Sequence, residues 1–169
     1  MTQYQRQTAN QESLMSILPP PALRHVTDLT VTLDPIRHMN TGRAGIRRII
    51  PIVGGTAQGP AINGKILNVG ADWQTQFASG LTELDTRYAI ETNDGATIEI
   101  QNYGYRHGPA EVLDALVRGE EVPHDAYYMR THARLETGDD RYAWVNHTLF
   151  VGHGARLNGL VQMSLFAID

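Results

Sequence analysis

The sequence contains no cysteine, which excludes disulfides, thiolate nucleophiles and zinc sites built on sulfur. It also lacks any apolar run long enough to cross a membrane. Residues 1–16 are polar and rich in Gln and Thr, whereas a signal peptide needs an apolar stretch. These absences lead us to expect a cytoplasmic protein with no membrane partner.

An excess of positive charge is also missing. Lys and Arg number 14 against 18 Asp and Glu, the formal net charge is −4, and the basic residues are spread along the chain. Proteins that bind nucleic acid usually carry a basic patch, so nucleic acid is not an expected partner. The seven histidines show neither HxH nor HExxH spacing, and we predict no metal site and no other cofactor.

The motifs of two enzyme classes are absent as well. No Gly-x-Ser-x-Gly segment occurs, so serine hydrolysis is not expected. The glycine-rich segment 54–59 lacks the Lys followed by Ser or Thr that ends a phosphate-binding loop. We expect its glycines to supply bulges and unusual φ angles instead.

What the sequence does contain is short segments in which apolar and polar residues alternate, the pattern of β-strands. They cover residues 25–33, 46–53, 61–69, 84–92, 97–105, 127–136, 142–151 and 160–168. One short helix is predicted over 109–118, because Pro109 suits a first helical position and Gly119 a cap. We therefore predict an all-β fold, a small antiparallel barrel of about eight or more strands, over residues 22–169 after a flexible arm over 1–21.

Two hairpins can be aligned by pattern. A three-residue turn at 93–95 sets Ile90 opposite Ile98 and Tyr88 opposite Ile100. A turn around 138–140 sets Leu135 opposite Ala143. The other faces of these hairpins collect polar and aromatic residues: Asp85, Arg87, Gln101 and Tyr103 on the first, and Arg130, His132, Arg134, Glu136, Tyr142, Trp144 and Asn146 on the second. Two interpretations remain: the polar faces meet water, or they line a ligand-binding lumen.

Several motifs together resemble one known family. They are Arg47 to Thr56, Gly59-Pro60, Gly70 to Trp73, Leu84 to Tyr88, Asp94-Gly95, Arg130-Thr131, Glu136 to Gly138, and Trp144 to Asn146 with Gly152 to Gly154. The family is catalogued as domain of unknown function 3237, also called uncharacterised protein family 0311. The resemblance implies a compact, calycin-like antiparallel barrel and no particular activity. The sequence departs from the family's usual pattern at Thr86, where alanine is common, and at His147, where arginine is more usual.

Candidate site residues come from the motifs and from the two polar faces. Asp72 or Asp85 would move a proton, and Arg87 and Arg130 would hold a developing oxyanion. The walls of the site and its further hydrogen-bonding groups would be Trp73, Tyr103, His132, Trp144 and Asn146. Each has a plain structural alternative: Asp72 as a turn cap, Trp73 as a core residue, and Asp85 with Arg87 as a surface ion pair.

The expected function is therefore that of a cofactor-independent acid–base enzyme of the isomerase, cyclase or lyase type. Its substrate would be a small apolar, aromatic or cyclic molecule in the barrel lumen. The alternative is a non-catalytic ligand-binding protein of the lipocalin kind. A third possibility is a homo-oligomeric structural protein with no pocket, whose exposed apolar strand faces pair between subunits.

Overall fold

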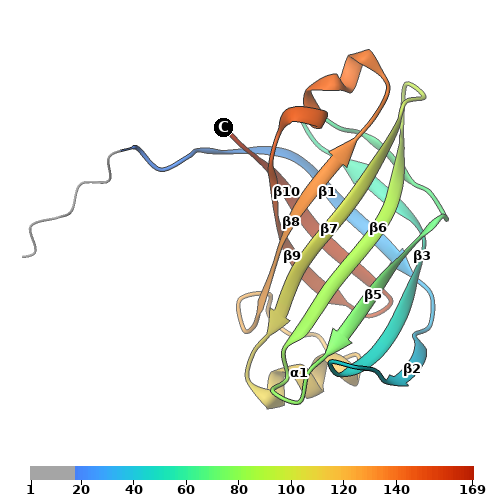
Figure 1. Cartoon of the computed structure of the whole chain (residues 1–169), viewed down its shortest axis with the longest axis vertical. Coiled ribbons are helices and arrows are strands. Elements are labelled where there is room, and N and C mark those ends of the chain that lie inside the picture. Colours follow the sequence, from blue (N-terminus) through green and yellow to red (C-terminus); the bar gives the residue numbers. More distant parts are fainter. Residues whose placement is uncertain (1–17) are drawn as a thin grey trace, which may run out of the picture.

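The structure, a computed structural model, describes residues 18–169. Its strands form one antiparallel sheet that closes into a barrel (Figure 1). In order around the ring, the closing strands are β1 (Leu23–Leu33), β10 (Leu160–Ile168), β9 (Phe150–Leu157), β8 (Tyr128–Glu136), β7 (Thr97–His107), β6 (Thr82–Thr92), β5 (Gly70–Gln76) and β3 (Ile46–Gln58). Pairing of β3 with β1 closes the ring. The predicted all-β antiparallel barrel is confirmed.

Two short strands and two helices complete the described part of the chain. β2 (Arg37–Thr41) pairs with the start of β3, and β4 (Gly64–Ile66) bridges β3 and β6. The predicted helix is present as α1 (Ala110–Val117), with Pro109 at its N-cap rather than in its first helical position. A second helix, the 3₁₀ helix η1 (Asp140–His147), was not predicted.

Neither of these two helices within residues 18–169 is long and apolar enough to cross a membrane. Most of the predicted N-terminal arm, residues 1–21, lies outside the described residues.

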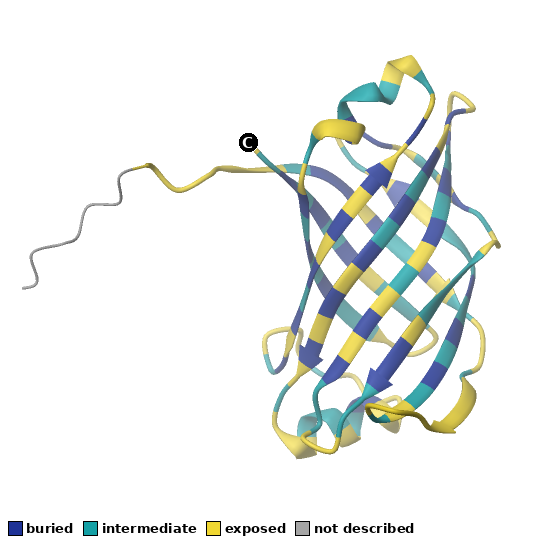
Figure 2. Ribbon diagram, viewed as in Figure 1, coloured by how far each residue is buried: buried dark blue, intermediate teal, exposed yellow. Residues whose placement is uncertain are grey.

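The core follows from the alternation of side chains along the strands. Figure 2 shows buried and exposed residues alternating along the strands at the front of the barrel, because successive side chains point to opposite faces of a strand. The first predicted hairpin is confirmed: Ile90 pairs with Ile98 and Tyr88 with Ile100, and Gly95 has a φ of 90° in the turn. All four paired side chains are buried, so the apolar face of this hairpin points into the barrel.

The second predicted hairpin is wrong. The Asp139 side chain accepts a hydrogen bond from the Arg141 backbone N–H at 3.0 Å, which caps η1 where the pattern predicted a strand. Asn146 then ties η1 back to β8 through two 2.9 Å hydrogen bonds to the Thr137 backbone. The true partner of β8 is β9, with Ala133 opposite Phe150.

The glycine-rich segment of β3 lies where this strand changes partners. Ile46 to Ile52 pair with β5, whereas Ile52 to Gln58 pair with β1, with an irregularity in register between them. At Gly55, whose φ is 133°, a Cβ would lie 1.9 Å from the Thr30 carbonyl oxygen. These glycines therefore let β3 bend and approach β1 closely.

The two ends of the barrel differ. At the upper end in Figure 1, η1 places Val145 in the core, and its Trp144 ring lies 5.8 Å from the ring of the buried Phe150. At the lower end lies α1, directly after β7, with Leu116 buried. The lumen is thus filled by apolar side chains near η1, and its polar groups lie toward α1.

Candidate functional site

The barrel encloses a cavity of about 40 Å³. Apolar side chains form much of its wall: Val31, Leu33, Ile50, Ile52, Leu84, Tyr88, Met129, Val161 and Met163. The remaining wall is polar and comprises Asp72, Gln74, Thr86, Asn102, Arg106, Thr131 and Arg156. A cavity of this size admits a few water molecules or a small charged group.

Asp72 is the carboxyl group of this cavity. It projects inward from β5, and its Oδ2 accepts a hydrogen bond from the Gln74 amide. Its Oδ1 accepts one from the Asp85 backbone N–H at 3.1 Å, and the Thr86 hydroxyl supplies a further hydrogen bond. These contacts fix the orientation of the carboxyl group inside the barrel.

Enclosure by the barrel raises the pKa of Asp72 above its ordinary value of 3.8. The hydrogen bonds from Gln74, Thr86 and the Asp85 backbone oppose this effect, and so does the positive charge of Arg106. Because the desolvation outweighs them, Asp72 takes up a proton more readily than an exposed aspartate does. A carboxyl group of this kind is a candidate to donate and accept protons in a reaction.

Three arginines surround the same space: Arg48 from β3, Arg106 from β7 and Arg156 from β9. Arg48 and Arg106 are only 6% and 5% exposed, and Arg156 is half-buried. Burial, followed by repulsion from Arg156 and Arg48, lowers the pKa of Arg106 to about 10. All three guanidinium groups therefore keep their positive charge at neutral pH.

These guanidinium groups have few protein partners. Arg48 Nε donates to the Gln74 Oε1 at 2.7 Å, and Gln74 in turn donates to Asp72. Among residues 18–169, Arg48 Nη2, Arg106 Nε and Arg156 Nη1 are buried and have no hydrogen-bond acceptor, and none of the three arginines forms a salt bridge. Buried polar groups are normally paired, so this set of donors makes the lumen the candidate binding site.

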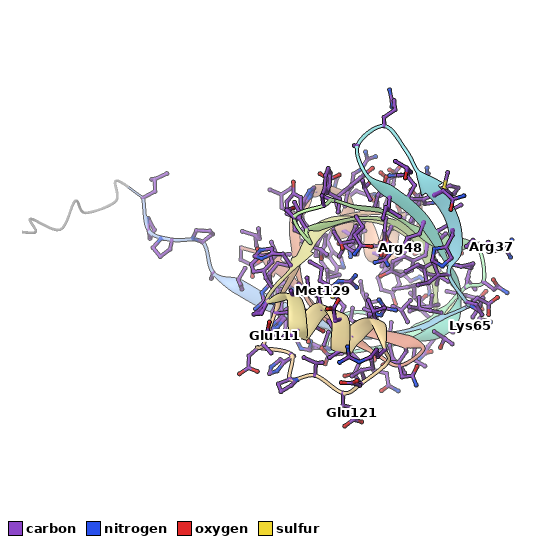
Figure 3. All side chains as sticks on the ribbon, turned by 90° about the horizontal axis from the view of Figure 1, so that it is seen from below. Arg37, Arg48, Lys65, Glu111, Glu121 and Met129 are labelled. Carbon is purple, nitrogen blue, oxygen red and sulfur yellow. The ribbon has the colours of Figure 1, made fainter. Side chains whose placement is uncertain are left out.

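The cluster lies toward the α1 end of the barrel. Arg106 is the penultimate residue of β7, two residues before the Gly108-Pro109 turn into α1, and it pairs with Met129. Figure 3, which looks into the barrel from this end, shows Arg48 and Met129 inside the ring of strands and Arg37 and Lys65 outside it.

The other residues singled out from the sequence do not lie in the lumen. Asp85, Arg87 and Tyr103 project outward from β6 and β7, and Trp73 projects outward from β5. The lumenal position considered for Asp85 and Arg87 is thus wrong, because the apolar face of the hairpin points inward. Arg87 pairs with Glu99 at 2.8 Å on the surface. Trp73, Asp85 and Tyr103 do meet, but around a solvent-open depression on the outside of the barrel.

Arg130 and His132 also lie on the outside of the barrel. The His132 ring stacks on Tyr103 at 5.7 Å, and the Arg130 guanidinium lies 5.4 Å from the centre of the Tyr128 ring. Together with Tyr105 these side chains form an exposed aromatic surface over β7 and β8.

Trp144 and Asn146 belong to η1 at the opposite end of the barrel from the arginines. Trp144 packs against Phe150, and both hydrogen bonds of the Asn146 amide go to the Thr137 backbone. Of all the predicted site residues, only Asp72 lies in the lumen.

The sequence held a signal for the missed arginines. Once Ile98 and Ile100 are placed inward by the first hairpin, the alternation of β7 also places Asn102 and Arg106 inward. The same alternation places Arg48 on the inward face of β3 with Ile50 and Ile52, and Arg156 on the inward face of β9 with Phe150. The signal for the site therefore lies in the few polar residues on the apolar faces of the strands, and not in the polar faces.

The residues described include no group of three or more His, Asp or Glu side chains that could hold a metal ion.

The sequence of the barrel matches a known protein family. A family described as protein of unknown function (DUF3237) matches residues 21–168, nearly all of the barrel. The chain belongs to this family. A DUF3237 relative, a UPF0311 protein of Rhodopseudomonas palustris, is 42% identical over 133 residues, which are 79% of this chain and 87% of that protein.

Solved structures agree with this assignment. The crystal structure of a conserved protein of unknown function from R. palustris has a TM-score of 0.87 and 38% identity, and the match covers 90% of this chain and 100% of that one. A β-barrel-like protein from Acinetobacter baumannii has a TM-score of 0.78 and 42% identity, with 90% and 98% covered.

A more distant similarity is to a hydroalkoxylation enzyme of Penicillium herquei, 23% identical over 150 residues, which are 89% of this chain and 85% of that protein. The crystal structure of an enzyme from the same fungus has a TM-score of 0.68 and 22% identity, with 92% and 100% covered. At this identity the structural likeness concerns the fold alone.

Proposed function

We propose that this DUF3237 barrel is a cofactor-independent acid–base enzyme of the isomerase, cyclase or lyase type, acting on a small, largely apolar or aromatic molecule in its lumen. One observation carries the proposal: the enclosed Asp72 carboxyl, whose pKa is raised, lies among guanidinium groups with which it forms no ion pair. Strongly perturbed carboxyl groups inside a pocket are typical of catalytic sites.

The roles of the residues follow from their chemistry. Asp72 exchanges a proton with the substrate, and Arg106, with Arg48 and Arg156, stabilises negative charge on a substrate oxygen. The apolar side chains Ile50, Ile52 and Leu84 contact the body of the substrate and exclude water. These groups suit reactions in which a proton is transferred and the substrate undergoes no net oxidation or reduction.

Addition of a hydroxyl group across a carbon–carbon double bond is one such reaction, and the name of the similar Penicillium herquei protein supports it. The oxygen bonds to one alkene carbon and the other carbon takes a proton from Asp72. The hydroxyl proton returns to Asp72, so atoms and charge balance without an oxidant or reductant. Guanidinium groups would stabilise the oxygen as it loses its proton.

The test is turnover of phenols that carry an alkenyl side chain beside the hydroxyl, such as 2-allylphenol and 2-prenylphenol. We expect a cyclic ether of unchanged mass, with one deuterium on carbon when the reaction runs in D₂O. Asp72→Asn should lower kcat about 100-fold or more, the usual contribution of a general acid–base group. Arg134→Met removes an exposed guanidinium that pairs with Glu136 and should leave turnover unchanged.

The non-catalytic, lipocalin-like alternative makes the opposite prediction for the same experiment. If members of the phenol panel bind in the lumen while neither cyclisation nor deuterium incorporation exceeds the rate without protein, the enzyme proposal is wrong.

A further inference from the structure

The lumen holds more positive than negative charge. Proton transfer by Asp72 alone does not require this excess. Three guanidinium groups share it with one carboxyl group, so its formal charge is +2 when Asp72 is ionised and +3 when it is protonated. The chain as a whole has a formal net charge of −4. The positive charge of the lumen is therefore a local feature of the site.

We propose that the ligand of this lumen is a small organic anion, a carboxylate or phenolate, whose charged oxygen contacts Arg106 together with Arg48 and Arg156. The inference shares with the proposed function the location of the site in the lumen, but it requires binding only and no turnover.

Hydrogen-bonding capacity supports an anionic oxygen. The buried and unpartnered Arg48 Nη2, Arg106 Nε and Arg156 Nη1 are all donors, and a guanidinium group has no acceptor atom. They require an acceptor, and a charged oxygen is the strongest one because charge-assisted hydrogen bonds are about twice as strong as neutral ones. A neutral amide or ether would leave most of the positive charge uncompensated.

Electrostatics leads to the same ligand class. An unpaired charge away from water is costly, and attraction between opposite charges is stronger there than on the surface. Asp72 attracts all three arginines but offsets only part of the charge, since it is one carboxylate against three guanidinium groups. Its oxygens accept hydrogen bonds from Gln74, Thr86 and the Asp85 backbone rather than from the arginines. An entering anion would meet guanidinium groups that no protein carboxylate occupies.

The lining of the cavity restricts how such a ligand lies. The guanidinium groups share the cavity with Met129, Met163 and an aliphatic wall, and the body of the ligand would lie against these apolar side chains. The flexible methionine side chains can move aside to admit it. The ligand thus combines one charged oxygen group with an apolar body.

A matched pair of probes tests the ligand class. Benzoate and benzamide have nearly the same shape and differ in charge, and 4-nitrophenolate adds a phenolate with an optical signal. By titration calorimetry with the full chain, we expect benzoate to bind at least 10-fold more tightly than benzamide. Arg106→Met should weaken benzoate binding at least 10-fold, and Arg106→Lys should weaken it less, because the charge remains while the planar donor set is lost.

Two more variants keep the test independent of folding defects. Asp72→Asn removes the competing negative charge and should tighten benzoate binding several-fold. Arg134→Met, which deletes an exposed arginine, should bind benzoate like the wild type.

Equal affinity for benzoate and benzamide would overturn the proposal. So would unchanged benzoate binding by Arg106→Met, or failure of benzoate and 4-nitrophenolate to bind at all. Anion binding without turnover of any alkenyl phenol would contradict the enzyme and leave the anion site standing. Turnover of alkenyl phenols without any preference for anionic ligands would contradict the anion site and leave the enzyme proposal standing.

Discussion

Asp72 and Arg106 line the same small cavity without forming an ion pair. The Asp72 carboxyl is held instead by Gln74, Thr86 and the Asp85 backbone, and Arg106 Nε has no acceptor among the described residues. A direct pair would keep the carboxyl ionised and occupy the guanidinium. Its absence leaves one group able to carry a proton and the other able to bind an anion.

The unpaired Arg106 should reduce the stability of the ligand-free protein. Arg106→Met replaces a buried cation with an apolar side chain of similar length, and we expect the free energy of unfolding to rise by about 1–3 kcal/mol. Urea denaturation without ligand measures this change. A clear loss of stability would indicate that Arg106 supports the fold rather than a ligand.

The Thr86 hydroxyl should tune the proton affinity of Asp72. It hydrogen-bonds the carboxyl and thereby favours the ionised form, so Thr86→Ala should raise the pKa of Asp72 further. Carboxyl ¹³C chemical shifts followed through a pH titration give this pKa directly. Glu91→Gln, which alters an exposed carboxylate paired with Lys65, serves as the control and should leave the Asp72 titration unchanged.

The raised pKa of Asp72 also predicts how stability depends on pH. Since the folded state binds this proton more tightly than the unfolded state, Asp72 contributes stability at low pH that is lost as pH rises from 3.8 through the folded pKa. In that window, the free energy of unfolding of the wild type minus that of Asp72→Asn should fall by up to about 1.4 kcal/mol per pH unit. Chemical denaturation of both proteins at several pH values checks the sign. A difference that grows with pH would mean that the arginines depress this pKa.

Asn146 should matter for stability. Its amide makes two hydrogen bonds of 2.9 Å to the Thr137 backbone and so holds η1 over the end of the barrel. Asn146→Ala leaves a partly buried backbone N–H and C=O without these partners, and we expect a loss of about 1–3 kcal/mol in the free energy of unfolding. Asn158→Ala, in the turn between β9 and β10, provides a matched surface control. No loss at Asn146 beyond that of the control would mean that η1 is held by packing alone.

Much of the fold could be predicted because it rests on local patterns. Alternation identified most strands, and the Asn93-Asp94-Gly95 turn fixed the register of β6 against β7. The 3₁₀ helix η1 could not be predicted from alternation, because Tyr142, Trp144 and Val145 also fit a strand. What decides the conformation is the Asp139 cap and the reach of Asn146 to Thr137.

The site was harder to predict, because a small barrel places its polar face outside and leaves isolated polar residues inside. Asp72 was recognised from its motif beside Trp73. Arg48 shares its face of β3 with isoleucines, and Arg106 shares its face of β7 with Ile98 and Ile100, so neither belongs to a polar face. The register of the first hairpin is enough to place Arg106 inward. Placing Arg156 inward requires the pairing of β8 with β9, which the wrongly predicted second hairpin excluded.

The pKa of Asp72, measured by carboxyl ¹³C NMR with and without benzoate, tests most directly whether a proton carrier and an anion site share the lumen. We predict a pKa above 3.8 in the free protein and a higher one with benzoate bound, because a neighbouring anion disfavours ionisation. A pKa at or below 3.8 that benzoate does not change would contradict both the acid–base role of Asp72 and the location of the anion beside it.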